Sequence, residues 1–79
     1  MKENQFGLSV KTAEYGYVEF QPLSNLHKQK ARAGKLFQSN PNILSVCVFD
    51  INGNGNLLSL KKDPVTKECV MRIEEPASV

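Results

Sequence analysis

One segment of this sequence, residues 26–38, has the apolar spacing of a helix, and this single helix limits the folds that the chain can form. At about 100° per residue, its apolar side chains share one face. Ser24 or Asn25 can cap its start, and Asn40 ends it because the residue before Pro41 avoids the α region. The apolar face consists of Leu26, Ala33, Leu36 and Phe37.

The other patterned segments alternate with period two, which is typical of strands with one buried face. They are residues 6–11, 17–21, 57–61 and 68–74. Residues 43–49 are apolar on both faces, which predicts an interior strand. The sequence therefore predicts an α+β fold with a single helix packed on an antiparallel sheet of about five strands, in the order ββαβββ.

Length and composition predict one folding unit. The chain has 79 residues, of which 41% are hydrophobic and 23% charged. These values are ordinary for a globular protein and far from those of disordered chains. We expect a single small domain over residues 1–79, with a loose tail at 75–79.

A single helix covers one face of such a sheet, so the other face is a candidate protein interface. In the interior strand we expect Leu44, Val46 and Val48 to point one way, and Ile43, Cys47 and Phe49 to point the other way, onto the outer sheet face. Two alternatives stay open: the sheet curls enough to bury the second set, or the alternation is shifted by one residue.

Positive charge is concentrated in the helix. Residues 24–40 hold four basic residues and no acid, so their net charge is +4, whereas the rest of the chain, with 6 basic and 8 acidic residues, has −2. Lys28, Arg32 and Lys35 follow helical spacing on the face opposite the apolar one. This basic helix stripe could meet phosphates or an acidic protein surface, or simply be a solvated helix face.

No catalytic, metal or cofactor site is predicted. Asp50–Gly55 matches the first half of a calcium-binding EF-hand loop, but Lys61 stands where the loop needs its last glutamate, so a hairpin turn is favoured. His27 has no nucleophile beside it in sequence. Cys47 is placed among apolar residues, where its thiol is a poor nucleophile. We therefore predict a protein that is not an enzyme and has no cofactor.

Cysteine usage favours a cytoplasmic protein. Cys47 and Cys69 each lie among apolar or β-branched residues, as buried free thiols do, although a single disulfide between them is possible. No segment is apolar enough for a secretory signal or a membrane span. We expect reduced thiols and no membrane association.

The order of a short hairpin, an alanine-containing helix and a three-stranded meander resembles that of several very small anti-CRISPR proteins of phages. The resemblance implies a stand-alone inhibitor whose charged face occupies a nucleic-acid path or a partner surface on a host complex. The residues predict a non-catalytic interaction module, a protein-binding adaptor or inhibitor. The alternative is weak nucleic-acid binding through Lys28, Arg32 and Lys35. A homodimer through the outer sheet face is a further possibility.

Overall fold

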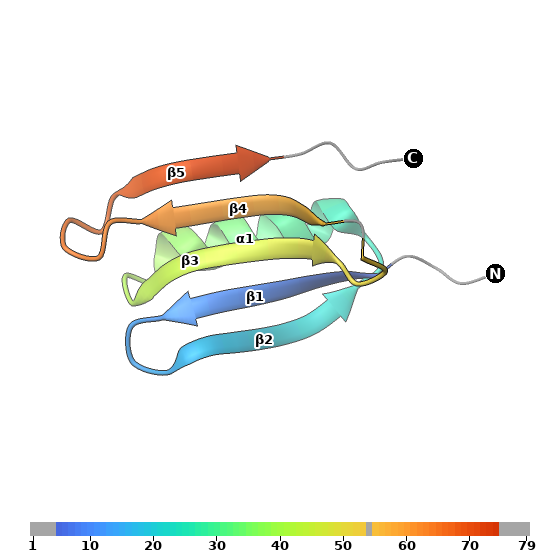
Figure 1. Cartoon of the computed structure of the whole chain (residues 1–79), viewed down its shortest axis with the longest axis horizontal. Helices are drawn as coiled ribbons and strands as arrows, with labels where there is room; N and C mark the ends of the chain where they lie inside the picture. Colours follow the sequence, from blue (N-terminus) through green and yellow to red (C-terminus); the bar gives the residue numbers. More distant parts are fainter. Residues whose placement is uncertain (1–4, 54, 75–79) are drawn as a thin grey trace.

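The predicted ββαβββ order is confirmed in a computed structural model of the chain, which describes residues 5–53 and 55–74. The sheet is antiparallel throughout, in the strand order β2-β1-β3-β4-β5, and the helix lies on one face of it (Figure 1). The expected loose tail, 75–79, lies outside the described residues. The elements are β1 (Phe6–Thr12), β2 (Gly16–Leu23), α1 (Leu26–Ser39), β3 (Ile43–Asp50), β4 (Asn56–Lys62) and β5 (Cys69–Glu74).

Helix α1 begins and ends where the sequence predicts. The Asn25 side chain accepts a hydrogen bond from the Lys28 backbone N–H at 3.0 Å, which satisfies one of the free donors of the first turn. At the other end, the Asn40 N–H donates to the Leu36 carbonyl at 3.2 Å. Both ends of the helix are therefore capped by asparagine.

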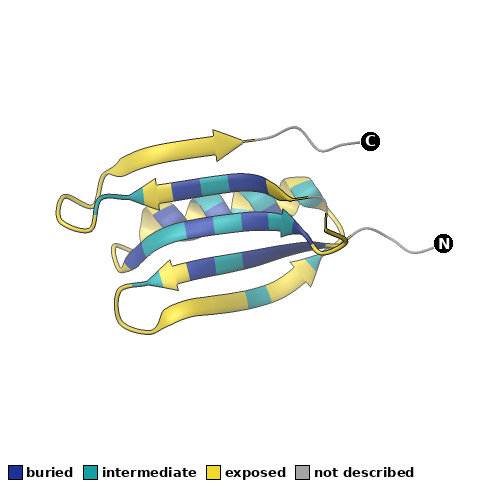
Figure 2. Ribbon diagram, viewed as in Figure 1, coloured by how far each residue is buried: buried dark blue, intermediate teal, exposed yellow. Residues whose placement is uncertain are grey.

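The core lies between the helix and the three inner strands. Figure 2 shows buried residues along β1, β3 and β4, whereas β5 is exposed along its whole length. The apolar residues of the core are Phe6, Leu8, Val10, Ala33, Phe37, Ile43, Val46, Val48, Leu57, Leu58 and Leu60.

Strand β2 runs through Pro22 to Leu23, two residues past its predicted end at residue 21. A proline is tolerated there because β2 is an edge strand. The β1–β2 register is also irregular at this point, between Phe6 and Leu8. Gln29, which is fully buried, fills the gap: its side-chain nitrogen donates to the carbonyl of Phe6 at 2.8 Å and to that of Gln21 at 3.2 Å.

The prediction that Ile43 lies on the outer sheet face is wrong. The β1–β3 register pairs Lys11 with Ser45 but Thr12 with Ile43, so it skips Leu44. This bulge shifts the alternation at the start of β3 and turns Ile43 into the core, where only 6% of it is exposed. Leu44, expected beside Val46 and Val48, is only half-buried.

The helix is not centred on the sheet. It packs chiefly against β3, and also against β1 and β2. On the β2 side, the Arg32 guanidinium lies 5.0 Å from the centre of the Phe20 ring and donates to the Gln21 carbonyl. On the side of β5, the helix carries small or polar residues, of which Lys30 reaches Glu74 of β5. Leu58 and Leu60 of β4 are buried, whereas β5 is exposed along its whole length.

Candidate binding groove

A groove of about 610 Å³ lies between α1 and the strands β4 and β5. Its apolar surface comes from Phe37 of the helix and from Leu58 and Leu60 of β4. Leu58 and Leu60 are only 3% and 5% exposed, so the groove is bounded mainly by the side of α1 and by the exposed strand β5. The other lining residues are His27, Lys30, Ala31, Gly34, Lys35, Gln38, Cys69, Arg72 and Glu74.

The helix side of the groove includes two small residues, Ala31 and Gly34. His27, Ala31, Gly34 and Gln38 follow helical spacing along one side of α1, and all four line the groove. A Cβ atom added to Gly34 would meet no atom within 4 Å. Glycine in a helix interior costs about 0.5–1 kcal/mol relative to alanine. Packing within the chain therefore does not require glycine at this position.

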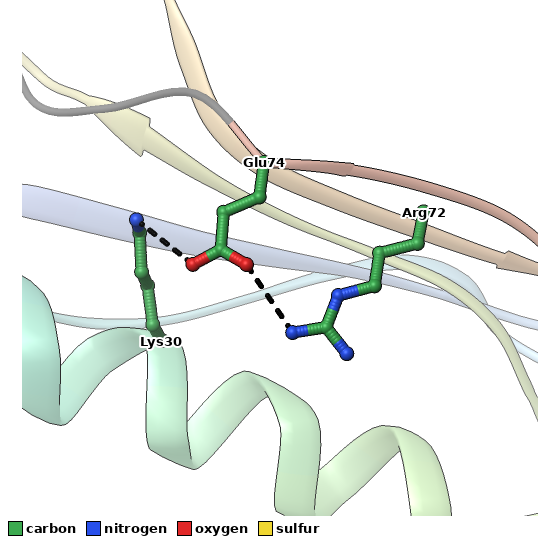
Figure 3. Close-up of polar contacts among 3 residues, drawn as sticks. All are labelled: Lys30, Arg72 and Glu74. Carbon is green, nitrogen blue, oxygen red and sulfur yellow. Dashed lines mark hydrogen bonds and ion pairs between the residues drawn. The ribbon is translucent and has the colours of Figure 1, made fainter.

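An ion network crosses one end of the groove. The Glu74 carboxylate accepts from the Lys30 ammonium at 3.3 Å and from the Arg72 guanidinium at 3.2 Å (Figure 3). The pKa of Glu74 is lowered, first by the hydrogen bond from Arg72 and then by that from Lys30. Because the group is exposed, each pair contributes little to stability. Glu74 is nevertheless the one carboxylate among the described residues that line the groove.

The other end of the groove continues into a smaller hollow of about 290 Å³, which shares Phe37, Gln38 and Cys69 with it. Lys62 borders this hollow: its ammonium lies 4.6 Å from the centre of the Phe37 ring and donates to the Asn40 carbonyl at 3.0 Å. Burial lowers the pKa of Lys62, and the charge of Lys67 lowers it further. The Lys62 side chain thus links β4 to the C-terminal end of α1.

The three residues of the basic helix stripe differ in how exposed they are. Lys28 and Lys35 are exposed, and Lys35 also lines the groove. Arg32 is half-buried, since its guanidinium is held over Phe20 and against the Gln21 carbonyl. Arg32 therefore anchors the helix to β2, while Lys28 and Lys35 remain available to a partner.

Two of the three residues predicted for the outer sheet face lie there. Cys47 and Phe49 alternate with the buried Val46 and Val48 of β3, and both are half-buried. The Phe49 ring covers Gly7 of β1, since a Cβ atom at Gly7 would lie 2.4 Å from the ring. Cys47 is flanked by Ser9 and Ser59 in the sheet register. The residues at the centre of this face are therefore small or polar, except for the aromatic Phe49.

The loop predicted as a hairpin turn connects β3 to β4. Gly53 and Gly55 adopt positive φ angles, and the Asp50 carboxylate accepts from the Asn52 N–H at 2.8 Å. Over residues 5–53 and 55–74, no group of three or more His, Cys, Asp or Glu side chains is placed to hold a metal ion. Cys47 and Cys69 are both free thiols.

Several groove residues were not singled out from the sequence. Arg72, Glu74 and Cys69 come from the last strand, and their position opposite the helix depends on where the helix sits. One signal was present, however: Gly34 interrupts an otherwise good helical pattern, and such a glycine often has a packing or functional reason.

No protein-family model, curated protein or solved structure matches this chain. In the part of the chain that the structure describes, no helix is long and apolar enough to cross a membrane.

Proposed function

We propose that this chain is a non-catalytic, protein-binding module that holds an acidic segment of a cytoplasmic partner in the groove between α1 and β5. It acts as an adaptor or an inhibitor. The inhibitory role implied by the resemblance to small anti-CRISPR proteins is one form of this proposal, because occupying a partner surface requires binding but no chemistry.

The observation that carries the proposal is Gly34. A helix interior disfavours glycine, and no neighbouring atom requires it here. A residue that breaks a local rule without a structural gain points to function. A side chain at position 34 would project into the space between α1 and the strands β4 and β5, so glycine keeps that space open for a ligand.

Charge supports an acidic partner. Lys30, Lys35 and Arg72 line the groove with Glu74 as their only acidic neighbour among the described lining residues. Lys28 extends the positive surface along the helix. Phe37, Leu58 and Leu60 lie below these cations as a narrow apolar floor, since they are only 5%, 3% and 5% exposed. A partner segment that combines carboxylates with apolar side chains complements both features.

The test is selection of a random peptide library against the wild-type protein, with counter-selection against Gly34→Leu. A Cβ atom at this position meets no atom within 4 Å, and leucine favours helix, so we expect the variant to fold with its side chain in the groove. We expect acidic sequences with apolar residues that bind the wild type, lose affinity for Gly34→Leu and Lys35→Glu, and retain it for Lys61→Glu. Peptides that bind Gly34→Leu as well as the wild type would contradict the proposal.

A second candidate function is weak nucleic-acid binding, favoured by the exposure of Lys28 and Lys35 on an outward-facing side of the helix. Contacts to phosphates alone give an affinity that falls steeply with salt. In a titration with short duplex DNA, Lys28→Glu combined with Lys35→Glu should abolish binding. Gly34→Leu should leave it intact, which separates this function from the groove proposal.

A further inference from the structure

Among the described residues, two cations and no acid line the hollow of about 290 Å³ at the end of the groove. The hollow lies where the α1–β3 and β4–β5 connections meet the same end of the sheet (Figure 1). Pro41 of the first connection and Lys67 of the second both line it. Lys62, the last residue of β4, supplies the other ammonium group. Two like charges are thus placed together without an acidic residue in the lining.

Contacts within the chain hold Lys62 and the backbone of Lys67 in position. The Lys62 ammonium lies 4.6 Å from the centre of the Phe37 ring and donates to the Asn40 carbonyl at 3.0 Å. The Lys67 N–H donates to the Asp63 carbonyl at 2.9 Å, with a φ of +64° at Lys67. Burial lowers the pKa of Lys62, and the charge of Lys67 lowers it further, so the two cations are close enough to repel each other. An anion between them offsets this repulsion.

The remaining lining of the hollow is uncharged. Phe37 and Pro41 contribute apolar rings, and Gln38 and Cys69 connect the hollow to the groove. Apolar surface beside a pair of cations suits a residue that presents an apolar side chain and a carboxylate from the same Cα atom. In a polypeptide only the C-terminal residue does so, because its main chain ends in a carboxylate.

We infer that the acidic segment in the groove is the C-terminal end of its partner, whose α-carboxylate lies between the ammonium groups of Lys62 and Lys67. The apolar side chain of the last residue then packs against Phe37 and Pro41. This inference rests on the proposed function, because it specifies which part of the partner enters the same groove. Hydrogen bonds from ammonium groups to a carboxylate are stronger than those between neutral groups.

The position of the hollow also sets the direction of the bound segment. Cys69 borders the hollow, and Glu74 lies at the other end of the groove, about 17 Å away along β5. An extended segment whose last residue occupies the hollow therefore runs parallel to α1 and places about five preceding residues along the groove. Acidic residues among these meet Lys30, Lys35 and Arg72.

The test uses two synthetic random octapeptide libraries, one with free C-terminal carboxylates and one with C-terminal amides, each selected against the wild-type protein. We expect the enriched peptides to come from the free-acid library, and their amides to bind about tenfold more weakly in fluorescence anisotropy. Lys67→Gln should weaken binding of the free acid by the same factor and leave that of the amide unchanged. Lys11→Gln, on β1 and outside the groove, is the matched control and should bind both forms as the wild type does.

Gly34→Leu separates this inference from the proposed function. If the free acid and the amide bind the wild type equally well and both lose affinity for Gly34→Leu, the inference is overturned while the groove is retained. A peptide that keeps its affinity after Gly-Ser is added to its C-terminus would also overturn the inference. If neither library yields a binding peptide, both fail. The comparison of acid and amide needs no variant, so it holds whatever Lys67→Gln does to stability.

Discussion

The side-chain nitrogen of Gln29 lies 2.8 Å from the backbone carbonyl oxygen of Phe6, inside the core. This contact joins the helix to the first strand at the position where the β1–β2 register breaks. Pairing between strands is irregular there, so the carbonyls of Phe6 and Gln21 need another donor. One amide supplies both hydrogen bonds, and it fixes the helix over β1.

Replacing Gln29 by methionine, which has a similar shape but no donor, should therefore lower the free energy of unfolding by about 1–3 kcal/mol. Gln29→Glu should cost more at neutral pH, because a buried carboxylate would face two carbonyl oxygens. Urea denaturation followed by circular dichroism measures both changes. Gln38→Met, at an exposed position of the same helix, is the control and should lie within about 0.5 kcal/mol of the wild type. Equal stability of the Gln29 and Gln38 variants would contradict this role.

Replacing a glycine by alanine should change the stability of the protein in opposite directions at two positions. Gly34→Ala removes the helix cost of glycine and meets no neighbouring atom, so it should stabilise the protein by about 1 kcal/mol. Gly53→Ala, at a φ of +94° in the β3–β4 turn, should destabilise it by about 1–2 kcal/mol, because side chains rarely adopt that conformation. Thermal unfolding of both variants measures the difference. A loss of stability in Gly34→Ala would mean that the position is structurally constrained after all.

The contact between Gly7 and Phe49 should appear as energetic coupling. Gly7→Ala forces the outer end of the half-buried Phe49 ring away from β1 and should destabilise the protein by about 1 kcal/mol. In a Phe49→Ala background the added methyl group meets no ring, so the same change should cost much less. A double-mutant cycle from urea denaturation measures this coupling, and additive effects would rule it out.

The carboxylate of Glu74 should titrate below its usual pKa of 4.5. Its charged form is favoured in the folded protein by Arg72 and Lys30, so its small contribution to stability is present above the unfolded pKa and is lost as the pH falls through the folded pKa. Arg72→Gln and Lys30→Gln should each raise the pKa of Glu74, because each removes a hydrogen bond and a positive charge from the carboxylate. NMR titration of the Glu74 side chain measures both shifts, and an unchanged pKa in either variant would contradict the assignment.

The helix and the strand order could be predicted from the sequence because they depend on local patterns. The apolar spacing of residues 26–38, the asparagine caps and the alternation in the strands all act within a few residues. Ile43 was misplaced because a bulge depends on the register with β1, and no pattern inside β3 reveals it. The continuation of β2 past residue 21 could not be predicted, because a proline is tolerated in an edge strand and edge position is a property of the whole sheet.

The groove could not be predicted for a related reason. It depends on a lateral offset of the helix, which is set by the fit of Gln29, Ala33 and Arg32 against the first three strands of the sheet order. Residues of the last strand, such as Arg72 and Glu74, become its neighbours only through that fit. In the sequence, Gly34 alone indicated that one side of the helix is not fully packed.

The strand order also has a consequence for the folding kinetics. Within the described sheet, β1 and β3 form the one pairing between strands that are not consecutive in the chain, and the whole helix lies between them. The first hairpin and the last three strands can each form through local contacts, whereas the β1–β3 seam must close a long loop. Closure of this seam, where Val10 lies opposite Val46, is therefore expected to limit the folding rate.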